Sequence, residues 1–332
     1  MTLSVAVVGP GNVGKALISQ IAEANWKLSY TMSRQGIHDH DGTLLTTTHD
    51  MDHPKVPKVD LAFITTPSTE VEHNYVNYYT NVNIPVVSSA KWVLSCRFGS
   101  MRRKLHLIGP YAMAGGGTTT LPWVVDRMRG RKNVTMHGVL NGTMCFIFDQ
   151  MDREKRTLDQ AVERARKLGY AEPGASSPLG IIQGEIKDTG YKAGVISNLC
   201  LDLPVYMCAE EIDTFRPFGE EELARVVAEA HERRYIVSFL PEGARDEPDI
   251  IGGFEHRLSN GLRISAGFKN VRRNPVYSNL ILTDANNAVL THEGRNGIYL
   301  GPSGPGAGLH ETAGAMMINA RRMIKDLYNR HC

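Results

Sequence analysis

Two charged residues on one predicted helix face could move a proton. Asp188 and Lys192 are four residues apart, and Val195 and Leu199 continue the same face at helical spacing. An acid beside a partly desolvated lysine can tune that lysine to accept or donate a proton. The alternative is an ion pair in solvent. Because an exposed pair would normally lie opposite the apolar stripe, we favour the functional interpretation.

The start of the chain carries a pattern that predicts a dinucleotide site. An apolar strand at residues 4–8 runs into Gly9-Pro10-Gly11-Asn12-Val13-Gly14, and helical spacing follows over residues 15–25. In this order the three glycines allow a tight turn, approach of the backbone to a pyrophosphate, and close packing of helix on strand. The N-terminus of the helix then offers N–H groups to the phosphates. A glycine-rich turn without a ligand is the alternative.

The end of the second predicted strand, residues 28–32, favours a phosphorylated cofactor. A site selective for NAD usually places an acid after this strand, where it binds a ribose hydroxyl. Ser33 and Arg34 stand there instead, and they suit a 2′-phosphate. We therefore expect NADP(H) as cofactor and keep NAD(H) as an alternative.

Two further predicted strands end in polar loops. Residues 59–64 lead into Thr65-Thr66-Pro67-Ser68, and residues 85–87 lead into Ser88-Ser89-Ala90-Lys91. Ligands of open α/β sheets bind outside the carboxyl ends of the strands. We assign Thr66, Pro67 and Ser89 to the cofactor site. Lys91 is a candidate for proton transfer, with a surface lysine at a helix start as the alternative.

The second half contains loops of glycine and small polar residues. Three consecutive glycines, residues 115–117, predict close approach of another backbone or a ligand. Asn141-Gly142-Thr143 opens a predicted helix, where the first N–H groups could hold a substrate carboxylate or be capped by a side chain. A second glycine-rich loop, residues 301–308, either closes over the cofactor through Gly306 and Gly308 or is a mobile connector.

The predicted elements indicate an α/β fold with two domains, because 332 residues exceed the usual size of one domain. We expect an N-terminal Rossmann domain with a doubly wound sheet at residues 1–130. An α+β substrate and dimerisation domain follows at residues 131–303, and a C-terminal loop and helix at 304–332 return to the first domain. The strand candidates of the second domain are residues 134–140, 235–240, 250–255, 262–265, 280–282, 288–290 and 298–300.

Composition excludes several classes of protein. The net charge of +2 requires no nucleic acid partner, and the short basic segments at 102–104 and 127–132 are typical of a solvated face. The five cysteines include no C-x-x-C pair, which argues against a disulfide framework or a structural zinc site and fits the cytoplasm. Neither a signal peptide nor a membrane-spanning stretch is visible, so no membrane association is expected.

The order of these motifs resembles that of the homoserine dehydrogenase family over nearly the whole chain. The matching pieces are the glycine fingerprint, Ser89-Ala90-Lys91, Gly115-Gly116-Gly117, Leu140-Asn141-Gly142-Thr143, Leu168-Gly169-Tyr170-Ala171-Glu172-Pro173, Asp188-x-x-x-Lys192, and Gly304-Pro305-Gly306-Ala307-Gly308 with Glu311-Thr312-Ala313. Together, in this order, they are highly specific.

The family interconverts L-homoserine and L-aspartate 4-semialdehyde by hydride transfer to or from NAD(P). The resemblance implies that Lys192 and Asp188 lie at the reacting oxygen, with Lys91 as a second candidate for proton transfer. It also implies that Glu172 holds the amino group of this small amino-acid substrate, close to Thr143. Gly142 and Tyr170 are assigned to the same site. A homodimer formed by the strand-rich region is a further implication.

The substrate segment departs from the family. An acid usually stands five residues before the position of Asp188 and a glycine two residues before it, whereas this chain has Gln183 and Ile186. Glu185 is a candidate replacement for the missing acid. The family's glutamate ahead of the glycine loop, associated with a monovalent cation, is Tyr111 here, and we expect no metal site. The chain carries no kinase or regulatory domain, so feedback inhibition is not expected.

Two alternatives stay open. One is a dehydrogenase of the same fold that acts on another small amino- or hydroxy-acid, which the altered Gln183 region suggests. The other is a non-enzymatic NADPH sensor that signals through a protein partner. The Asp188 and Lys192 pair argues against the sensor, because a sensor needs no proton-transfer groups.

Overall fold

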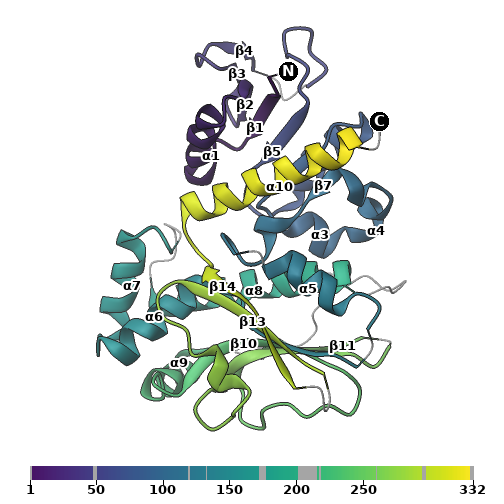
Figure 1. The fold of residues 1–332 in the computed structure, drawn as a ribbon. Coiled ribbons are helices and arrows are strands. Elements are labelled where there is room, and N and C mark those ends of the chain that lie inside the picture. Colours follow the sequence, from purple (N-terminus) through teal and green to yellow (C-terminus); the bar gives the residue numbers. More distant parts are fainter. Residues whose placement is uncertain are drawn as a thin grey trace. The chain divides into compact units, whose positions relative to one another are not determined.

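The structure is a computed structural model, in which the chain forms two compact units (Figure 1). The first is Met1–Met113 with Leu309–Cys332, and the second is Ala114–Gly308. The residues that the structure describes are 2–47, 51–118, 120–131, 133–171, 177–200, 215–216, 218–258, 260–293 and 297–329.

The first unit contains a seven-stranded sheet in the order β4-β3-β2-β1-β5-β6-β7. Strands β2, β1, β5, β6 and β7 are parallel, and β3 and β4 add an antiparallel edge beyond β2. The chain passes from β1 to β2 on one side and then crosses to β5 on the other, which makes the sheet doubly wound. The strands are β1 Ser4–Val8, β2 Lys27–Ser33, β3 Gly36–Asp39, β4 Leu44–Thr46, β5 Leu61–Ile64, β6 Val86–Ser88 and β7 Ile108–Gly109.

Helices of the first unit bury this sheet, which explains the continuous apolar run of β1. Val5 and Val7 share one core with residues of α1 and of the C-terminal helix α10, among them Leu17 and Met316. The C-terminal helix thus returns to the first sheet, as we predicted. The helices are α1 Asn12–Glu23, α2 Glu70–Asn81, α3 Trp92–Cys96, α4 Phe98–Met101 and α10 Leu309–Asn329, with 3₁₀ helices at Arg102–Leu107 and Tyr111–Met113.

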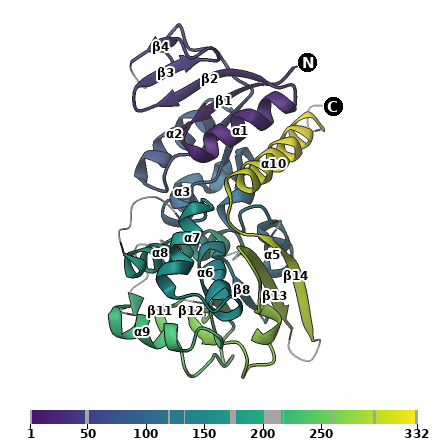
Figure 2. The same cartoon turned by 90° about the vertical axis from the view of Figure 1, so that its left-hand side faces the viewer.

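The second unit is built on an antiparallel sheet in the order β14-β13-β8-β10-β12-β11-β9 (Figure 2). Its strands are β8 Thr135–Val139, β9 Phe215–Arg216, β10 Arg233–Leu240, β11 Ile251–Arg257, β12 Arg263–Asn270, β13 Asn286–His292 and β14 Ile298–Pro305. Its helices are α5 Thr120–Met128, α6 Gly142–Arg153, α7 Leu158–Lys167, α8 Pro178–Cys200 and α9 Glu220–Ala228. The expected fold class, a Rossmann-type sheet with a second, antiparallel one, is confirmed. Helix α5 belongs to this unit because it packs on α8, β13 and β14.

Three local predictions were wrong. Residues 301–305 belong to strand β14 rather than to a loop, because an edge strand tolerates prolines that cannot donate a hydrogen bond. The strand expected at residues 280–282 is absent, because Leu280 ends a 3₁₀ helix, Tyr277–Leu280, and residues 281–282 have no regular structure. The Asn274 side chain accepts from Val276 N at the start of this helix. Helix α8 begins at Pro178, well before residue 184, with Ser177 Oγ accepting from Gly180 N.

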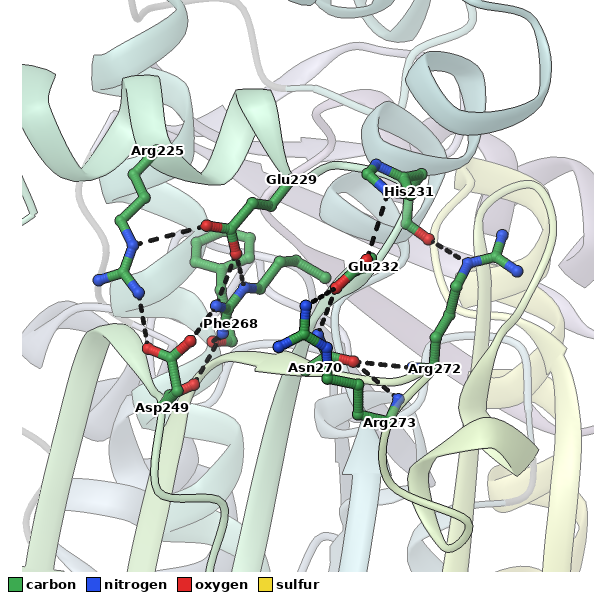
Figure 3. A network of polar contacts seen from close by, with 10 residues as sticks. Arg225, Glu229, His231, Glu232, Asp249, Phe268, Asn270, Arg272 and Arg273 are labelled. Carbon is green, nitrogen blue, oxygen red and sulfur yellow. Dashed lines mark hydrogen bonds and ion pairs between the residues drawn. The ribbon is translucent and has the colours of Figure 1, made fainter.

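A network of ion pairs ties α9 to the second sheet. Figure 3 shows Glu229 and Asp249 facing Arg225. Arg233, the first residue of β10, is buried beneath them; its Nε donates to Glu229 Oε2 at 2.7 Å and its Nη1 to the Asp249 carbonyl at 2.7 Å. Arg233 Nη2 also donates to the Asp249 carboxylate, and this hydrogen bond holds the pKa of the carboxyl below its usual value. Arg233 therefore joins the helix, the sheet and the segment before β11.

Replacing Arg233 with alanine is expected to destabilise the protein by about 3 kcal/mol, because it empties a buried site and leaves backbone carbonyls without donors. Arg225→Ala is the matched control. The Arg225 side chain is 51% exposed, so breaking its ion pair with the same Asp249 should cost less than about 1 kcal/mol. Urea unfolding followed by circular dichroism measures both values. Equal losses for the two variants would show that Arg233 has no special role.

Candidate active site

The glycine fingerprint lies at the carboxyl end of β1, beside the end of β2. Gly9 has a positive φ of 89°, and its N–H donates to Met32 O at 2.8 Å. Gly11 N donates to Gly9 O at 2.7 Å, and helix α1 starts at Asn12, followed by Val13. Residues 9–14 therefore form a tight turn that ends in a helix N-terminus, which is the arrangement that binds a pyrophosphate.

The three glycines of the fingerprint differ in whether the surrounding protein leaves space for a side chain. A Cβ on Gly9 would lie 2.9 Å from Thr66 N, and one on Gly14 would lie 2.6 Å from Gly9 O, so packing forbids a side chain at both. A Cβ on Gly11 would meet nothing closer than Gly9 O at 4.0 Å. The exposed Gly11 is thus not required by any described protein contact. A ligand that approaches its backbone would explain it.

The candidate residues for a 2′-phosphate lie in a tight hairpin. Ser33 ends β2 and pairs with Gly36, so that Arg34 and Gln35 form a two-residue turn into β3. Ser33 Oγ accepts from Gln35 N at 3.1 Å, and Arg34 is exposed. Because Gly9 N is bonded to Met32 O, this hairpin starts next to the fingerprint.

The loops after β5 and β6 lie at the same sheet edge. Thr65 Oγ1 donates to Gly9 O at 2.5 Å, which joins the end of β5 to the fingerprint. The Thr66 hydroxyl is buried with no partner among the described residues, and Pro67 beside it is exposed. Ser89 N donates to Ile64 O at 3.1 Å. The parallel sheet thus brings the cofactor candidates of the first unit to one edge. Gly306 and Gly308 belong to the second unit.

Lys91 is half-buried and is held through its backbone. Its N–H donates to Ser68 Oγ at 3.0 Å, and it directly precedes α3. Glu72, a fully buried acid close by on α2, was not among the predicted site residues. A signal was available, because Glu72 stands on the buried helix face with Val76 and Tyr79.

The charged pair of the second unit joins a buried lysine, Lys192, to a partly exposed acid, Asp188. Lys192 Nζ lies 2.8 Å from Asp188 Oδ2 and donates to the Leu140 carbonyl at 2.9 Å. The Lys192 side chain is 9% exposed and that of Asp188 30% exposed. This geometry excludes the solvent ion pair that we weighed as the alternative. It fixes the amine of Lys192 at the carboxyl end of β8.

The residues that follow Leu140 start α6 and make further polar contacts. Asn141 Oδ1 accepts from Met144 N at 2.8 Å, so Asn141 caps α6. Its Nδ2 donates to Glu185 Oε2 at 2.7 Å. Thr143 Oγ1 donates to the Tyr170 carbonyl at 2.7 Å, and the Tyr170 ring packs edge-on against Phe146. Thr143 and Tyr170 therefore lie together beside the loop, whereas Glu172 is outside the described residues.

Glycine loops of the second unit pack directly on one another. A Cβ on Gly142 would lie 2.6 Å from Ala285 O and 2.7 Å from Ala307 N. A Cβ on Gly116 would lie 2.5 Å from Gly306 O, and one on Gly306 would overlap the Asn287 side chain. The predicted close approach at residues 115–117 is therefore made by another backbone. Gly306 is held in this contact, and Gly308 directly precedes α10.

Sequence comparison decides the family. A profile described as homoserine dehydrogenase matches residues 123–319. The chain belongs to the homoserine dehydrogenase family. A homoserine dehydrogenase of Lactococcus lactis subsp. lactis is 25% identical over 224 residues, which cover 61% of this chain. The chain spans about half the length of this relative, 51%.

Solved structures of homoserine dehydrogenases share the fold. The homoserine dehydrogenase of Thermoplasma acidophilum has a TM-score of 0.67 at 16% identity and covers 98% of this chain and 100% of its own. A hyperthermophilic archaeal homoserine dehydrogenase in complex with NADPH has a TM-score of 0.66 at 19% identity, with 98% of each chain covered. In the described part of this chain, no helix has both the length and the apolar character needed to cross a membrane.

Two departures from the homoserine dehydrogenase family are placed by the structure. Gln183 Nε2 donates to the Phe218 carbonyl at 2.8 Å, so this side chain is held by the segment before α9. Glu185, one turn before Asp188, instead reaches Asn141 in the loop that holds Lys192. Tyr111 packs on α10, where its N–H donates to Asn319 Oδ1 at 2.9 Å and its ring contacts Arg322.

Proposed function

We propose that this chain is an oxidoreductase that interconverts L-homoserine and L-aspartate 4-semialdehyde with NADP(H). The observation that carries the proposal is the buried contact of Lys192 with Asp188 and with the Leu140 carbonyl, in a member of this family. A buried ammonium beside a carboxylate is suited to proton transfer. A cofactor sensor has no use for such a pair.

The chain's own residues supply the proton in this reaction. When bound, reduced nicotinamide supplies a hydride to the aldehyde carbon. An ammonium group has three N–H donors, of which Lys192 uses one on Asp188 and one on Leu140 O. The third donates to the aldehyde oxygen and transfers its proton as that oxygen becomes a hydroxyl. In the reverse direction neutral Lys192 accepts the proton, and the Asp188 carboxylate stabilises the resulting ammonium.

The loop at the start of α6 is proposed to hold the amino-acid part of the substrate. Gly142 and Thr143 lie in the first turn of α6, where the helix dipole favours a carboxylate. Tyr170 supports Thr143 through its carbonyl. Glu172 follows two residues later in the chain and is proposed to bind the amino group, as the family resemblance suggests. Lys91 stays the second candidate for proton transfer.

The residues of the first unit fit a dinucleotide. Gly11 leaves open space over the fingerprint, and the Thr66 hydroxyl lacks a partner among the described residues. Asn12 and Val13 at the start of α1, with Gly9 and Gly14, would hold the pyrophosphate, and Ser33 with Arg34 a 2′-phosphate. We extend the cofactor site to Pro67, Ser89, Gly306 and Gly308. A homodimer and a cytoplasmic location remain predictions.

Arg34→Ala is expected to weaken NADPH binding by about tenfold or more and to leave NADH binding unchanged, because it removes a charge-assisted hydrogen bond to the 2′-phosphate only. Fluorescence titration with each nucleotide measures the two dissociation constants. Lys27→Ala is the control, since Lys27 is an exposed cation at the opposite end of the same strand. An unchanged ratio of the two constants in Arg34→Ala would remove Arg34 from the cofactor site.

Gln183 stands where the family usually has an acid. This difference supports a second candidate function, a dehydrogenase for another small amino- or hydroxy-acid. The absorbance of NADPH, followed with L-aspartate 4-semialdehyde and with a panel of small aldehydes, separates the two functions. We expect aspartate semialdehyde to be reduced with the highest kcat/KM. Rapid reduction of another aldehyde, with none of aspartate semialdehyde, would favour the second candidate.

A further inference from the structure

Glu72 is a buried acid that the reaction described above does not use. It lies in the first turn of α2, and no part of it is accessible to solvent. Buried carboxyl groups are rare unless they are paired or hydrogen-bonded, because the loss of hydration is costly. The contacts of Glu72 therefore call for a specific explanation.

Those contacts all reach the segment that carries Lys91. Ser88 Oγ, at the end of β6, donates to Glu72 Oε1 at 3.1 Å, and Ala90 N donates to Ser88 Oγ at 3.1 Å. Val93 N, in α3, donates to Glu72 Oε2 at 3.3 Å. One carboxyl thus binds the chain on both sides of Lys91. Lys91 N donates to Ser68 Oγ, so the backbone of the segment is also fixed at Lys91 itself.

The electrostatics point to the same residue. Burial raises the pKa of the Glu72 carboxyl to about 7, while the backbone N–H of Val93, the Ser88 hydroxyl and the positive charge of Lys91 lower it. Lys91, which directly precedes α3, is the charged group that acts on Glu72. On α2 itself, His73 contacts Ser100 Oγ, and Glu70 is exposed. Glu72 is therefore ionised above neutral pH, where its charge favours the ammonium form of Lys91.

We propose that Glu72 is a positioning residue that fixes the Ser88–Val93 segment and whose negative charge favours the ammonium form of Lys91. The catalytic meaning of this role rests on the proposed function, in which Lys91 is the second proton-transfer candidate. The effect on the charge of Lys91 does not rest on it and can be measured without turnover. If Glu72 only held the segment in place, its removal would not change the reactivity of the Lys91 amine through loss of charge.

Competitive acetylation at pH 9 tests the proposal, because only neutral amines react. Trace acetic anhydride is added to the whole protein, and mass spectrometry gives the labelling of Lys91 relative to exposed Lys27. Glu72→Gln should raise this ratio about threefold or more, since the carboxylate charge is lost. Glu70→Gln, in the same helical turn, should leave it unchanged. An unchanged ratio in natively folded Glu72→Gln would overturn the proposal.

Loosening of the segment could also raise the labelling, so Ser88→Ala serves as a second control. It removes one hydrogen bond to Glu72 and keeps the charge, and its ratio should stay close to that of the wild type. A rise as large as that of Glu72→Gln would overturn the proposal. If Glu72→Gln does not fold, Glu72→Asp replaces it, with a rise expected because the shorter side chain withdraws the charge. No rise in that variant would contradict the proposal as well.

Turnover gives a separate readout. If the proposed function is right, kcat of Glu72→Gln for aldehyde reduction should decline at a lower pH than that of the wild type, with KM unchanged. Absence of turnover in the wild type would count against the proposed function alone. A raised acetylation ratio with an unshifted pH profile would show that Glu72 controls the charge of Lys91 but that Lys91 does not donate the proton, which overturns the catalytic part.

Discussion

Replacing Lys192 with alanine is expected to lower kcat by about a thousandfold, since general acid–base groups commonly contribute this much. The loss should appear in kcat, with NADPH affinity nearly intact, because Lys192 lies in the second unit and the fingerprint in the first. Steady-state kinetics and a fluorescence titration of NADPH measure the two quantities.

The controls for Lys192 separate chemistry from packing. Lys192→Met keeps most of the buried volume but has no group that can donate or accept a proton. It should be as inactive as Lys192→Ala. Lys187→Ala removes an exposed lysine from the same helix and should keep nearly full activity. If either Lys192 variant retained most of its kcat, the lysine would have no catalytic role, and Lys91 would become the leading candidate for proton transfer.

Gly142→Ala is expected to reduce kcat/KM by about a hundredfold, because small displacements of a positioning loop have effects of this size. The new Cβ would lie 2.6 Å from Ala285 O and 2.7 Å from Ala307 N, so the loop must move. Leu140, two residues before Gly142, accepts a hydrogen bond from Lys192 through its carbonyl, and Thr143 directly follows Gly142. One methyl group therefore shifts both the proton donor and the proposed carboxylate site.

Gly184→Ala is the matched control for Gly142. A Cβ on Gly184, an exposed position of α8, meets nothing within 4 Å, and alanine is the better helix former. This variant should keep full activity and gain a little thermal stability. Equal activity of both variants would show that the loop at the start of α6 does not position the substrate.

The parts of the site that depend on short-range spacing could be predicted from the sequence. Asp188 and Lys192 are one helical turn apart, so any helix brings them together. Gly9 and Gly14 are required by the turn from β1 into α1, so this turn can be recognised from the six residues 9–14. The doubly wound character of the first sheet was predicted from the same patterns, but its antiparallel edge, β3 and β4, was not.

Other features depend on contacts between distant residues. Glu72 can be buried because Ser88 and Val93, from another strand and helix, donate hydrogen bonds to it. The sequence around Glu72 does not indicate these donors. The sequence predicts a loop at residues 301–308 because Pro302 and Pro305 suggest a break, yet residues 301–305 continue β14 beside its partner strand β13 at a sheet edge. The hairpin that presents Arg34 depends on pairing of β2 with β3. Glu172 falls outside the described residues and stays a prediction.

In the proposed reaction, a hydride from NADPH reaches the aldehyde carbon of L-aspartate 4-semialdehyde. The most direct test uses NADPH that carries deuterium at the transferable position of the nicotinamide, with mass spectrometry of the product. We expect homoserine with one deuterium on its hydroxyl-bearing carbon, and none with Lys192→Ala on the same time scale. If the wild type binds NADPH but forms no deuterated homoserine, the proposed reaction is contradicted.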